Sequence, residues 1–286
     1  MKKIGFIDHF LDEWHANNYP KWIRESTFKG KFDVCYAWAE KDKAGGQTSR
    51  KWCKTQQVEW AGSKEELIAK SDCIIVLSPD NPERHEDLCR GVLSSGKPVY
   101  VDKTFAPDLK TAKKLFAWAE KSRTPMFSSS ALRFAQEIGD IQANRKITRD
   151  NIKFVATRGP GQFSNYSIHQ IEMIVTLMGP GAKRLIHCGI NGVPVIMIDY
   201  GKNRRAMLSM MADHPFQISI QYGENKGVNI PEVKGSFFQR FIEEMLAFFE
   251  SGKPVVPKEE TLEVMAIIET GSRALNKADK WVAIPR

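Results

Sequence analysis

The sequence predicts an α/β protein with a Rossmann-like, doubly wound parallel sheet followed by an α+β domain with an open antiparallel sheet. The length of 286 residues is typical of about two domains. In the first part, short apolar runs alternate with amphipathic helices, which is typical of a parallel sheet covered on both faces. From about residue 150, strands follow one another through short turns, which indicates antiparallel pairing. We therefore expect a Rossmann-like domain over residues 1–128 and a substrate-binding and dimerisation domain over 129–286.

The elements of the first domain follow from continuous apolar runs for strands and helical periodicity for helices. Ser63 precedes a short helix, and Glu66 three residues later completes a capping box. The expected strands are Lys3–Ile7, Phe32–Trp38, Cys73–Leu77, Val99–Val101 and Pro125–Ser128. The longer expected helices are Trp14–Glu25, Pro82–Ser95 and Asp108–Lys121.

The second domain is expected to contain a run of strands interrupted by one helix and closed by two more. Tight connections between neighbouring strands favour antiparallel order. The expected strands are Lys153–Thr157, Arg184–Gly189, Val195–Tyr200, Ala206–Met211 and Gln217–Tyr222. The expected helices are Ser167–Met178, Ser236–Glu250 and Glu259–Leu275.

Charge and hydropathy exclude several classes of protein. The net charge is +8, but the basic residues are spread over helix faces, so we expect no nucleic-acid partner. The longest apolar runs are too short to span a bilayer, so we expect no membrane segment. Asp8 interrupts the first apolar segment too early for a secretory signal, and the five cysteines form no Cys-x-x-Cys pair. We therefore expect a cytoplasmic protein with free thiols.

Two polar groups point to proton chemistry. Lys103 follows the apolar strand Val99–Val101, and the carboxyl ends of parallel strands are where open α/β sheets bind ligands. Asn165 and His169 are four residues apart, on one face of an expected helix. A lysine and a histidine together can move a proton to or from a hydroxyl or carbonyl group.

Four regions of the chain resemble the Gfo/Idh/MocA oxidoreductases, the group of glucose–fructose oxidoreductase and inositol dehydrogenase. Their order and spacing along the chain carry the resemblance more than any single motif does. The regions are Ser71–Pro79 followed by His85, Gly96–Thr104, Asn165–His169 with Glu172 and Gly179, and Phe238–Trp281.

The resemblance implies oxidation of a sugar or polyol hydroxyl, or reduction of the ketone, with NAD or NADP. It also implies a homodimer or homotetramer. Lys103 would touch the nicotinamide ribose and the substrate oxygen, His169 would be the acid/base, and Asn165 would orient the substrate. The expected cofactor-binding residues are Asp8, Phe10, Trp38, Ser78, Pro79, Asp102 and Lys103. The expected substrate-binding residues are Asn165, His169, Glu172 and Arg158; Glu172 and Arg158 have structural roles as alternatives.

The chain departs from this family at the phosphate loop. Where the family has Gly-x-Gly-x-x-Gly, this chain has Asp8-His9-Phe10-Leu11-Asp12-Glu13. The glycines allow a tight turn and close approach of the diphosphate. A carboxylate about 4 Å from a phosphate charge adds repulsion of about 4 kcal/mol at an effective dielectric constant of about 20. A non-redox enzyme or a ligand-binding, regulatory protein on the same fold is therefore the alternative.

Two further features of this region bear on ligands. The second expected strand ends without an acidic residue for the ribose hydroxyls, although Glu40 lies just beyond it. The acids and histidines between Asp8 and His15 are suitable metal ligands, but acidic residues also complement the start of a helix. We expect no metal and retain this cluster as the alternative.

Overall fold

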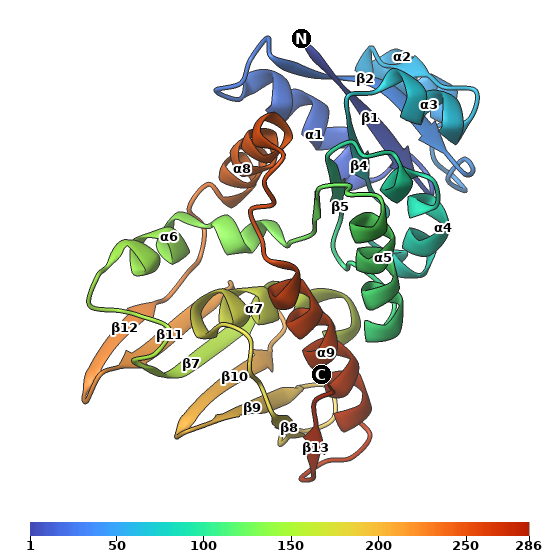
Figure 1. The fold of residues 1–286 in the computed structure, drawn as a ribbon. Coiled ribbons are helices and arrows are strands. Elements are labelled where there is room, and N and C mark those ends of the chain that lie inside the picture. The colour runs from blue at the N-terminus through green and yellow to red at the C-terminus, as the bar shows by residue number, and fades with distance from the viewer. Residues whose placement is uncertain (286) are drawn as a thin grey trace. The chain divides into compact units, whose positions relative to one another are not determined.

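The computed structural model describes residues 1–285, which divide into two compact units (Figure 1). The first unit contains Met1–Ser129 and Phe241–Lys258, and the second contains Ser130–Arg240 and the chain from Glu259 onward. The break after Ser129 lies one residue from the predicted boundary. The return of Phe241–Lys258 to the first unit differs from the predicted division, which placed these residues in the second domain.

The first unit is built on a six-stranded sheet in the order β3-β2-β1-β4-β5-β6. Every neighbouring pair is parallel, which confirms the predicted doubly wound sheet. The strands are β1 (Lys2–Asp8), β2 (Phe32–Ala39), β3 (Glu59–Trp60), β4 (Cys73–Val76), β5 (Val99–Val101) and β6 (Met126–Phe127). The helices are α1 (Trp14–Glu25), α2 (Ser49–Gln56), α3 (Lys64–Lys70), α4 (His85–Cys89) and α5 (Leu109–Lys121).

The predicted helix over Pro82–Ser95 is wrong in its length. Only α4 is α-helical, and 3₁₀ turns at Pro82–Arg84 and Val92–Ser94 flank it. Gly91 has a φ of 83°, a conformation that glycine adopts readily and that cannot continue a right-handed helix. Apolar residues recur at helical spacing on both sides of Gly91, so the sequence pattern did not indicate that the helix ends there.

Helix α8 (Phe237–Ser251) supplies the aromatic residues that join the returning segment to the first unit. The Phe241 ring lies 5.9 Å from Tyr19 and 5.1 Å from Tyr100, and the Phe248 ring lies 5.0 Å from Phe127. Aromatic pairs at these separations bury a large apolar area. This face of α8 therefore belongs to the core of the first unit.

The second unit holds a seven-stranded sheet in the order β12-β11-β7-β10-β9-β8-β13. All neighbouring pairs are antiparallel, as predicted, except the pair β7 and β10, which is parallel. Helix α7 and strands β8 and β9 intervene between them, and this long connection returns the chain in the same direction. The sheet is therefore mixed, which corrects the predicted antiparallel sheet.

Helix α7 lies along one face of this sheet, above β7 and β10 (Figure 1). Within residues 1–285, no helix is both long enough and apolar enough to cross a membrane. The strands are β7 (Ile152–Gly159), β8 (Arg184–His187), β9 (Val195–Gly201), β10 (Arg204–Met210), β11 (Gln217–Tyr222), β12 (Lys226–Ile230) and β13 (Trp281–Ala283). The α-helices are α6 (Gln136–Ala143), α7 (Phe163–Met178) and α9 (Lys258–Ala274), and a 3₁₀ turn at Ala131–Phe134 precedes α6.

Candidate functional site

The β1–α1 connection carries a fully buried carboxyl group. Asp8 ends β1, and its Oδ1 accepts a hydrogen bond from the His9 N–H at 2.6 Å. Its Oδ2 is buried without a hydrogen-bond partner. Burial raises the pKa of Asp8 well above its usual value, and the neighbouring Glu13 charge raises it further. Burial therefore makes the Asp8 carboxyl group harder to ionise than an exposed aspartate.

A second carboxyl group caps helix α1. Glu13 is the N-cap residue, and its carboxylate accepts hydrogen bonds from the backbone N–H of His15 at 2.8 Å and from that of Ala16. Burial raises the pKa of Glu13 to about 7. The first N–H groups of a helix have no partner within the helix, and they are the groups that bind phosphates in dinucleotide folds. In this chain Glu13 uses two of them.

Asp102 forms a buried pair with His15 just after β5. Its Oδ2 bonds His15 Nδ1, and its Oδ1 accepts from the Tyr100 hydroxyl at 3.0 Å and from the Lys103 N–H at 2.8 Å. Burial alone raises the pKa of Asp102, but the His15 charge and hydrogen bond outweigh it and hold this pKa below its usual value. The His15 ring also stacks on Tyr19, with ring centroids 5.1 Å apart. The pair therefore fixes the orientation of this imidazole.

Lys103 lies at the carboxyl end of the parallel sheet, as the sequence predicts. Its side chain is largely buried, its Nζ donates to the Pro79 carbonyl at 3.2 Å, and the peptide bond to Thr104 is cis. Ser78, the other predicted residue of this loop, has a φ of 90°, and its Oγ donates to the Asn81 carbonyl at 3.3 Å. The structure thus brings Lys103 together with Asp102 and Pro79.

His85 joins the two loops beside Lys103. Its Nε2 lies 2.8 Å from the Leu77 carbonyl after β4, and its Nδ1 lies 3.0 Å from the Phe105 carbonyl after β5. The ring is fully buried, and burial lowers its pKa. His85 therefore links the segments that carry Pro79 and Lys103.

The remaining predicted cofactor residues are two half-buried aromatic rings. Phe10 lies beneath the Lys43 ammonium, 5.4 Å from its ring centroid, and Trp38 on β2 lies 6.0 Å from the Lys64 ammonium. Glu40, which follows Trp38, accepts hydrogen bonds from Arg84 at 2.9 and 2.6 Å. It also bonds the ring of His9 at 2.5 Å. Its oxygens thus already have protein partners at the end of β2.

In the second unit, His169 is half-buried on α7 and is held by a serine. The distance between Ser130 Oγ and His169 Nδ1 is 2.7 Å. Tyr166 and Phe216 pack edge-on against its ring, with centroids at 5.4 and 5.6 Å. Asn165 lies exposed one turn earlier on the same helix. The predicted pair of Asn165 and His169 therefore shares one face of α7.

Glu172 lies on the same helix but belongs to a buried ion network. Its Oε2 accepts from Arg133 Nε at 2.7 Å, and its Oε1 accepts from the Ser130 N–H at 3.4 Å. Arg133 Nη1 donates to Glu260 at 2.5 Å, and Arg149 Nη2 donates to Glu260 at 2.6 Å. Burial raises the pKa of Glu172, and the Arg133 charge opposes that rise. These contacts indicate a structural role for Glu172, which lies three residues after His169 on the same helix.

Arg158 is separate from this network. It is exposed on β7, where its neighbours in register are Ser209 and Gln217. Sequence reasoning did not assign Ser130 or His85 to a catalytic or binding site, and it considered His15 only as a metal ligand. The run Ser128-Ser129-Ser130 directly after β6 was the signal for Ser130, because polar residues after a parallel strand are often functional.

The acids and histidines of the β1–α1 segment have separate partners. Asp12 accepts from the Gln47 N–H at 2.9 Å, while His9 bonds Glu40 and His15 bonds Asp102. Across the described chain, no group of three or more His, Cys, Asp or Glu side chains is placed to hold a metal ion. This segment is therefore a set of pairs, and the metal alternative finds no support in its geometry.

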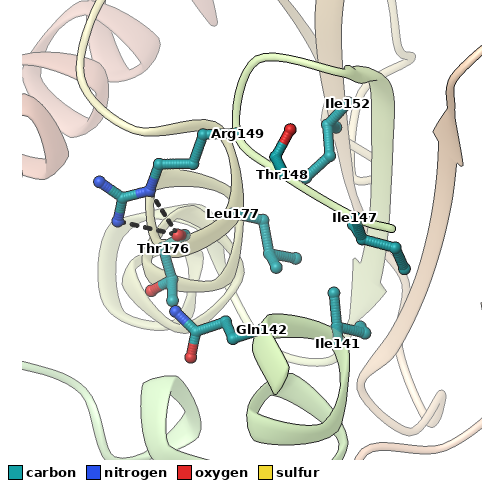
Figure 2. A pocket seen from close by; sticks show the side chains of 8 residues that line it. All are labelled: Ile141, Gln142, Ile147, Thr148, Arg149, Ile152, Thr176 and Leu177. Carbon is teal, nitrogen blue, oxygen red and sulfur yellow. Dashed lines mark hydrogen bonds between the residues drawn. The ribbon is translucent and has the colours of Figure 1, made fainter. Parts of the chain in front are cut away.

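A cavity of about 210 Å³ opens in the second unit, away from the predicted residues (Figure 2). Arg149 Nε and Nη2 donate to the Thr176 carbonyl at its edge, at 3.3 and 3.0 Å. The lining residues are Ile141, Gln142, Ile147, Thr148, Arg149, Ile152, Thr176 and Leu177. Four of the eight lining residues are aliphatic and four are polar or charged, and neither His169 nor Asn165 is among them.

The start of α1 does not fit the diphosphate of a dinucleotide. In Rossmann folds the diphosphate takes N–H groups at the N-terminus of the first helix. Here the Glu13 carboxylate takes the His15 and Ala16 N–H groups, and Asp8 lies buried at the end of β1. A second anion placed there would meet repulsion of the order of 4 kcal/mol from each ionised carboxylate at about 4 Å and an effective dielectric constant of about 20.

Residues 39–129 match the model of the Gfo/Idh/MocA family, which is described as an oxidoreductase family with an NAD-binding Rossmann fold. The match confirms the predicted resemblance over this segment, and it begins after the β1–α1 connection. No curated protein matches the chain.

Solved structures share the fold across almost the whole chain. A probable dehydrogenase from Thermotoga maritima has a TM-score of 0.80 at 13% identity, covering 99% of this chain and 98% of that one. The apo scyllo-inositol dehydrogenase from Lactobacillus casei has a TM-score of 0.79 at 15% identity, covering 99% and 98%. GenD2 from gentamicin A biosynthesis, solved with NAD, has a TM-score of 0.79 at 12% identity, covering 100% and 97%. These similarities establish the fold.

Proposed function

We propose that this chain, whose residues 39–129 carry the NAD-binding Rossmann fold of the Gfo/Idh/MocA oxidoreductases, acts on a sugar, polyol or related hydroxy or keto compound. The main support is that Lys103 and His169, the two proton-transfer groups predicted from the sequence, are each held by a defined partner. Inositol dehydrogenases among the proteins of similar fold support the substrate class.

Lys103 has the role of contacting the substrate oxygen. Its ammonium is tethered to the Pro79 carbonyl, and its backbone N–H is fixed on Asp102. A positive charge held at the end of a parallel strand stabilises negative charge that develops on an alcohol or carbonyl oxygen. The His85 contacts hold the neighbouring loops, so that the lysine is positioned before a ligand arrives.

His169 has the role of acid/base, and Asn165 that of orienting the substrate. With Nδ1 occupied by Ser130, proton exchange by this imidazole passes through Nε2. The rings of Tyr166 and Phe216 restrict its rotation. Arg158 and Glu172 are also proposed to bind the substrate. The proposal is weaker for Glu172, because its carboxylate already pairs with the buried Arg133.

The cofactor in this proposal is NAD or NADP. Asp8, Phe10, Trp38, Ser78, Pro79 and Asp102 remain the residues proposed for it. Because Glu13 occupies the start of α1, the cofactor would be held without those N–H groups.

We also propose self-association through the open face of the second sheet. A row of half-exposed or exposed apolar side chains crosses it in register. The row consists of Ala156, Met207, Met197, Ile186 and Trp281. Light scattering is expected to report a homodimer or homotetramer, and a Met207→Arg variant is expected to shift it toward monomer.

A non-redox enzyme or ligand-binding protein on the same fold is the second candidate. The Glu13 contacts favour it, because they occupy groups that a dinucleotide ordinarily uses. Under this alternative, Lys103 and His169 would bind a hydroxylated ligand without any oxidation.

Calorimetric titration with NADH and NADPH, followed by a spectrophotometric screen of inositols and sugars, separates the two candidates. Cofactor binding and turnover are expected, with turnover lost in Lys103→Met and His169→Asn. Exposed Lys110 and half-buried His214 provide the matched controls Lys110→Met and His214→Asn. Sugar binding without nucleotide binding would favour the second candidate.

A further inference from the structure

The Glu13 carboxylate is enclosed at the start of α1. The residue is 6% exposed, and both of its oxygens accept hydrogen bonds from the helix backbone. The chain therefore provides its own anion at the position where a phosphate otherwise sits. A ligand phosphate can bind these N–H groups only if this carboxylate leaves or loses its charge.

The groups around Glu13 strengthen this exclusion. Asp8 faces it from β1, and Asp102 faces it from the end of β5. On α1 itself, His15 and Tyr19 lie nearby, but the His15 imidazole is paired with Asp102. Three carboxyl groups and one histidine thus surround the first turn, and an approaching anion meets no unpaired cation among them.

We infer that Glu13 is an internal competitor of the diphosphate, and that this carboxylate keeps dinucleotides from using the N-terminus of α1. The inference deepens the proposed function and rests on it for the class of ligand, since it states which side chain sets the affinity for a nucleotide. A dinucleotide bound to this chain then depends on contacts beyond the helix start.

ADP-ribose is a suitable probe because it carries the diphosphate but cannot transfer a hydride. Calorimetry compares the wild-type chain with Glu13→Ser, whose hydroxyl preserves a helix cap. Asp12→Asn is the matched control, because it removes a neighbouring charge that bonds Gln47 and not the helix start. At about pH 8, Glu13→Ser is expected to bind about tenfold more tightly than wild type, equivalent to about 1.4 kcal/mol. Asp12→Asn is expected to match wild type. Equal binding by Glu13→Ser and wild type, or an equal gain in Asp12→Asn, would overturn the inference.

A pH series on the wild-type chain tests the same competition without a substitution. Protonation removes the Glu13 charge, and the pKa of this group is about 7. The diphosphate diester of ADP-ribose keeps its charge across this range, so wild type is expected to bind more tightly at about pH 6 than at about pH 8. Glu13→Ser should lack this dependence. Wild-type affinity that does not rise as the pH falls overturns the inference, even where the variant fails to fold. Absence of turnover of inositols and sugars with oxidised NAD or NADP would count against the proposed oxidation and leave this comparison unchanged.

Discussion

Arg133 and Glu172 form an ion pair inside the second unit, with Nε and Oε2 2.7 Å apart and only 7% and 2% of the two side chains exposed. Ser130 connects this pair to His169, because its N–H donates to Glu172 and its hydroxyl bonds the imidazole. The proposed acid/base is therefore supported from below by a buried charge network. The position of the His169 ring therefore depends on the ion pair between Arg133 and Glu172 remaining intact.

Replacing Arg133 with methionine is expected to destabilise the protein by about 3–5 kcal/mol, because it leaves Glu172 and Glu260 buried without their shared cation. Urea denaturation measures the change. Arg149→Met is the control, since this arginine bonds the same Glu260 from a side chain that is 47% exposed, and about 1 kcal/mol or less is expected. Equal losses in the two variants would contradict the assignment of Arg133 as the central partner.

Glu13 makes stability fall as the pH rises. Its pKa is about 7 in the folded chain, whereas an unfolded glutamate titrates at about 4.3, so the folded state binds the proton more tightly. The free energy of unfolding is therefore expected to decrease between about pH 4.3 and about pH 7. Glu13→Gln keeps an acceptor oxygen for the helix and lacks this titration. Urea denaturation at several pH values gives the free energy of unfolding of both chains. The difference between Glu13→Gln and wild type should increase in favour of the variant as the pH rises across this range. A difference that does not change with pH would contradict the raised pKa of Glu13.

How far the sequence predicts this molecule depends on how local the determining contacts are. Helix α1 and strand β5 occur at their predicted residues, because apolar periodicity and the local run specify them. Helix α5 begins at Leu109, one residue after the predicted start, and Asp108 is its N-cap. The parallel pairing of β7 with β10 is a contact between distant segments, and nothing within either strand encodes its direction.

In the candidate site, too, local patterns identify some residues, whereas distant partners appear only in the folded structure. Lys103 and Asn165 with His169 were found because strand ends and helix spacing are visible in the sequence. The partner of His169, Ser130, is 39 residues away, and the partner of Arg133, Glu260, is 127 residues away. Only the folded chain reveals that Glu172 faces Arg133 rather than a ligand.

His85 has the opposite pH dependence to Glu13. Burial lowers its pKa in the folded chain, so below the usual histidine pKa of about 6.5 the unfolded state binds the additional proton. Stability is therefore expected to fall as the pH drops through this value. His85→Leu should lose this dependence, and it should cost about 1–3 kcal/mol, because the buried carbonyl that accepts the imidazole N–H is left without a donor. Urea denaturation across the pH range measures both effects, and His214→Asn is the control; an unchanged pH profile in His85→Leu would exclude the assignment.

Removal of the Ser130 hydroxyl tests how His169 is oriented. If the proposed oxidation holds, Ser130→Ala is expected to lower kcat by about tenfold with little change in KM, against about 100-fold or more for His169→Ala. Nitrogen NMR of the His169 ring gives a readout that needs no turnover, because loss of the Ser130 partner should change the balance between the two tautomers. Ser130→Thr retains a hydroxyl at the same position and should restore both the rate and the tautomer. Identical ring spectra in wild type and Ser130→Ala would mean that Tyr166 and Phe216 alone orient the imidazole, since these rings pack against it from two other positions.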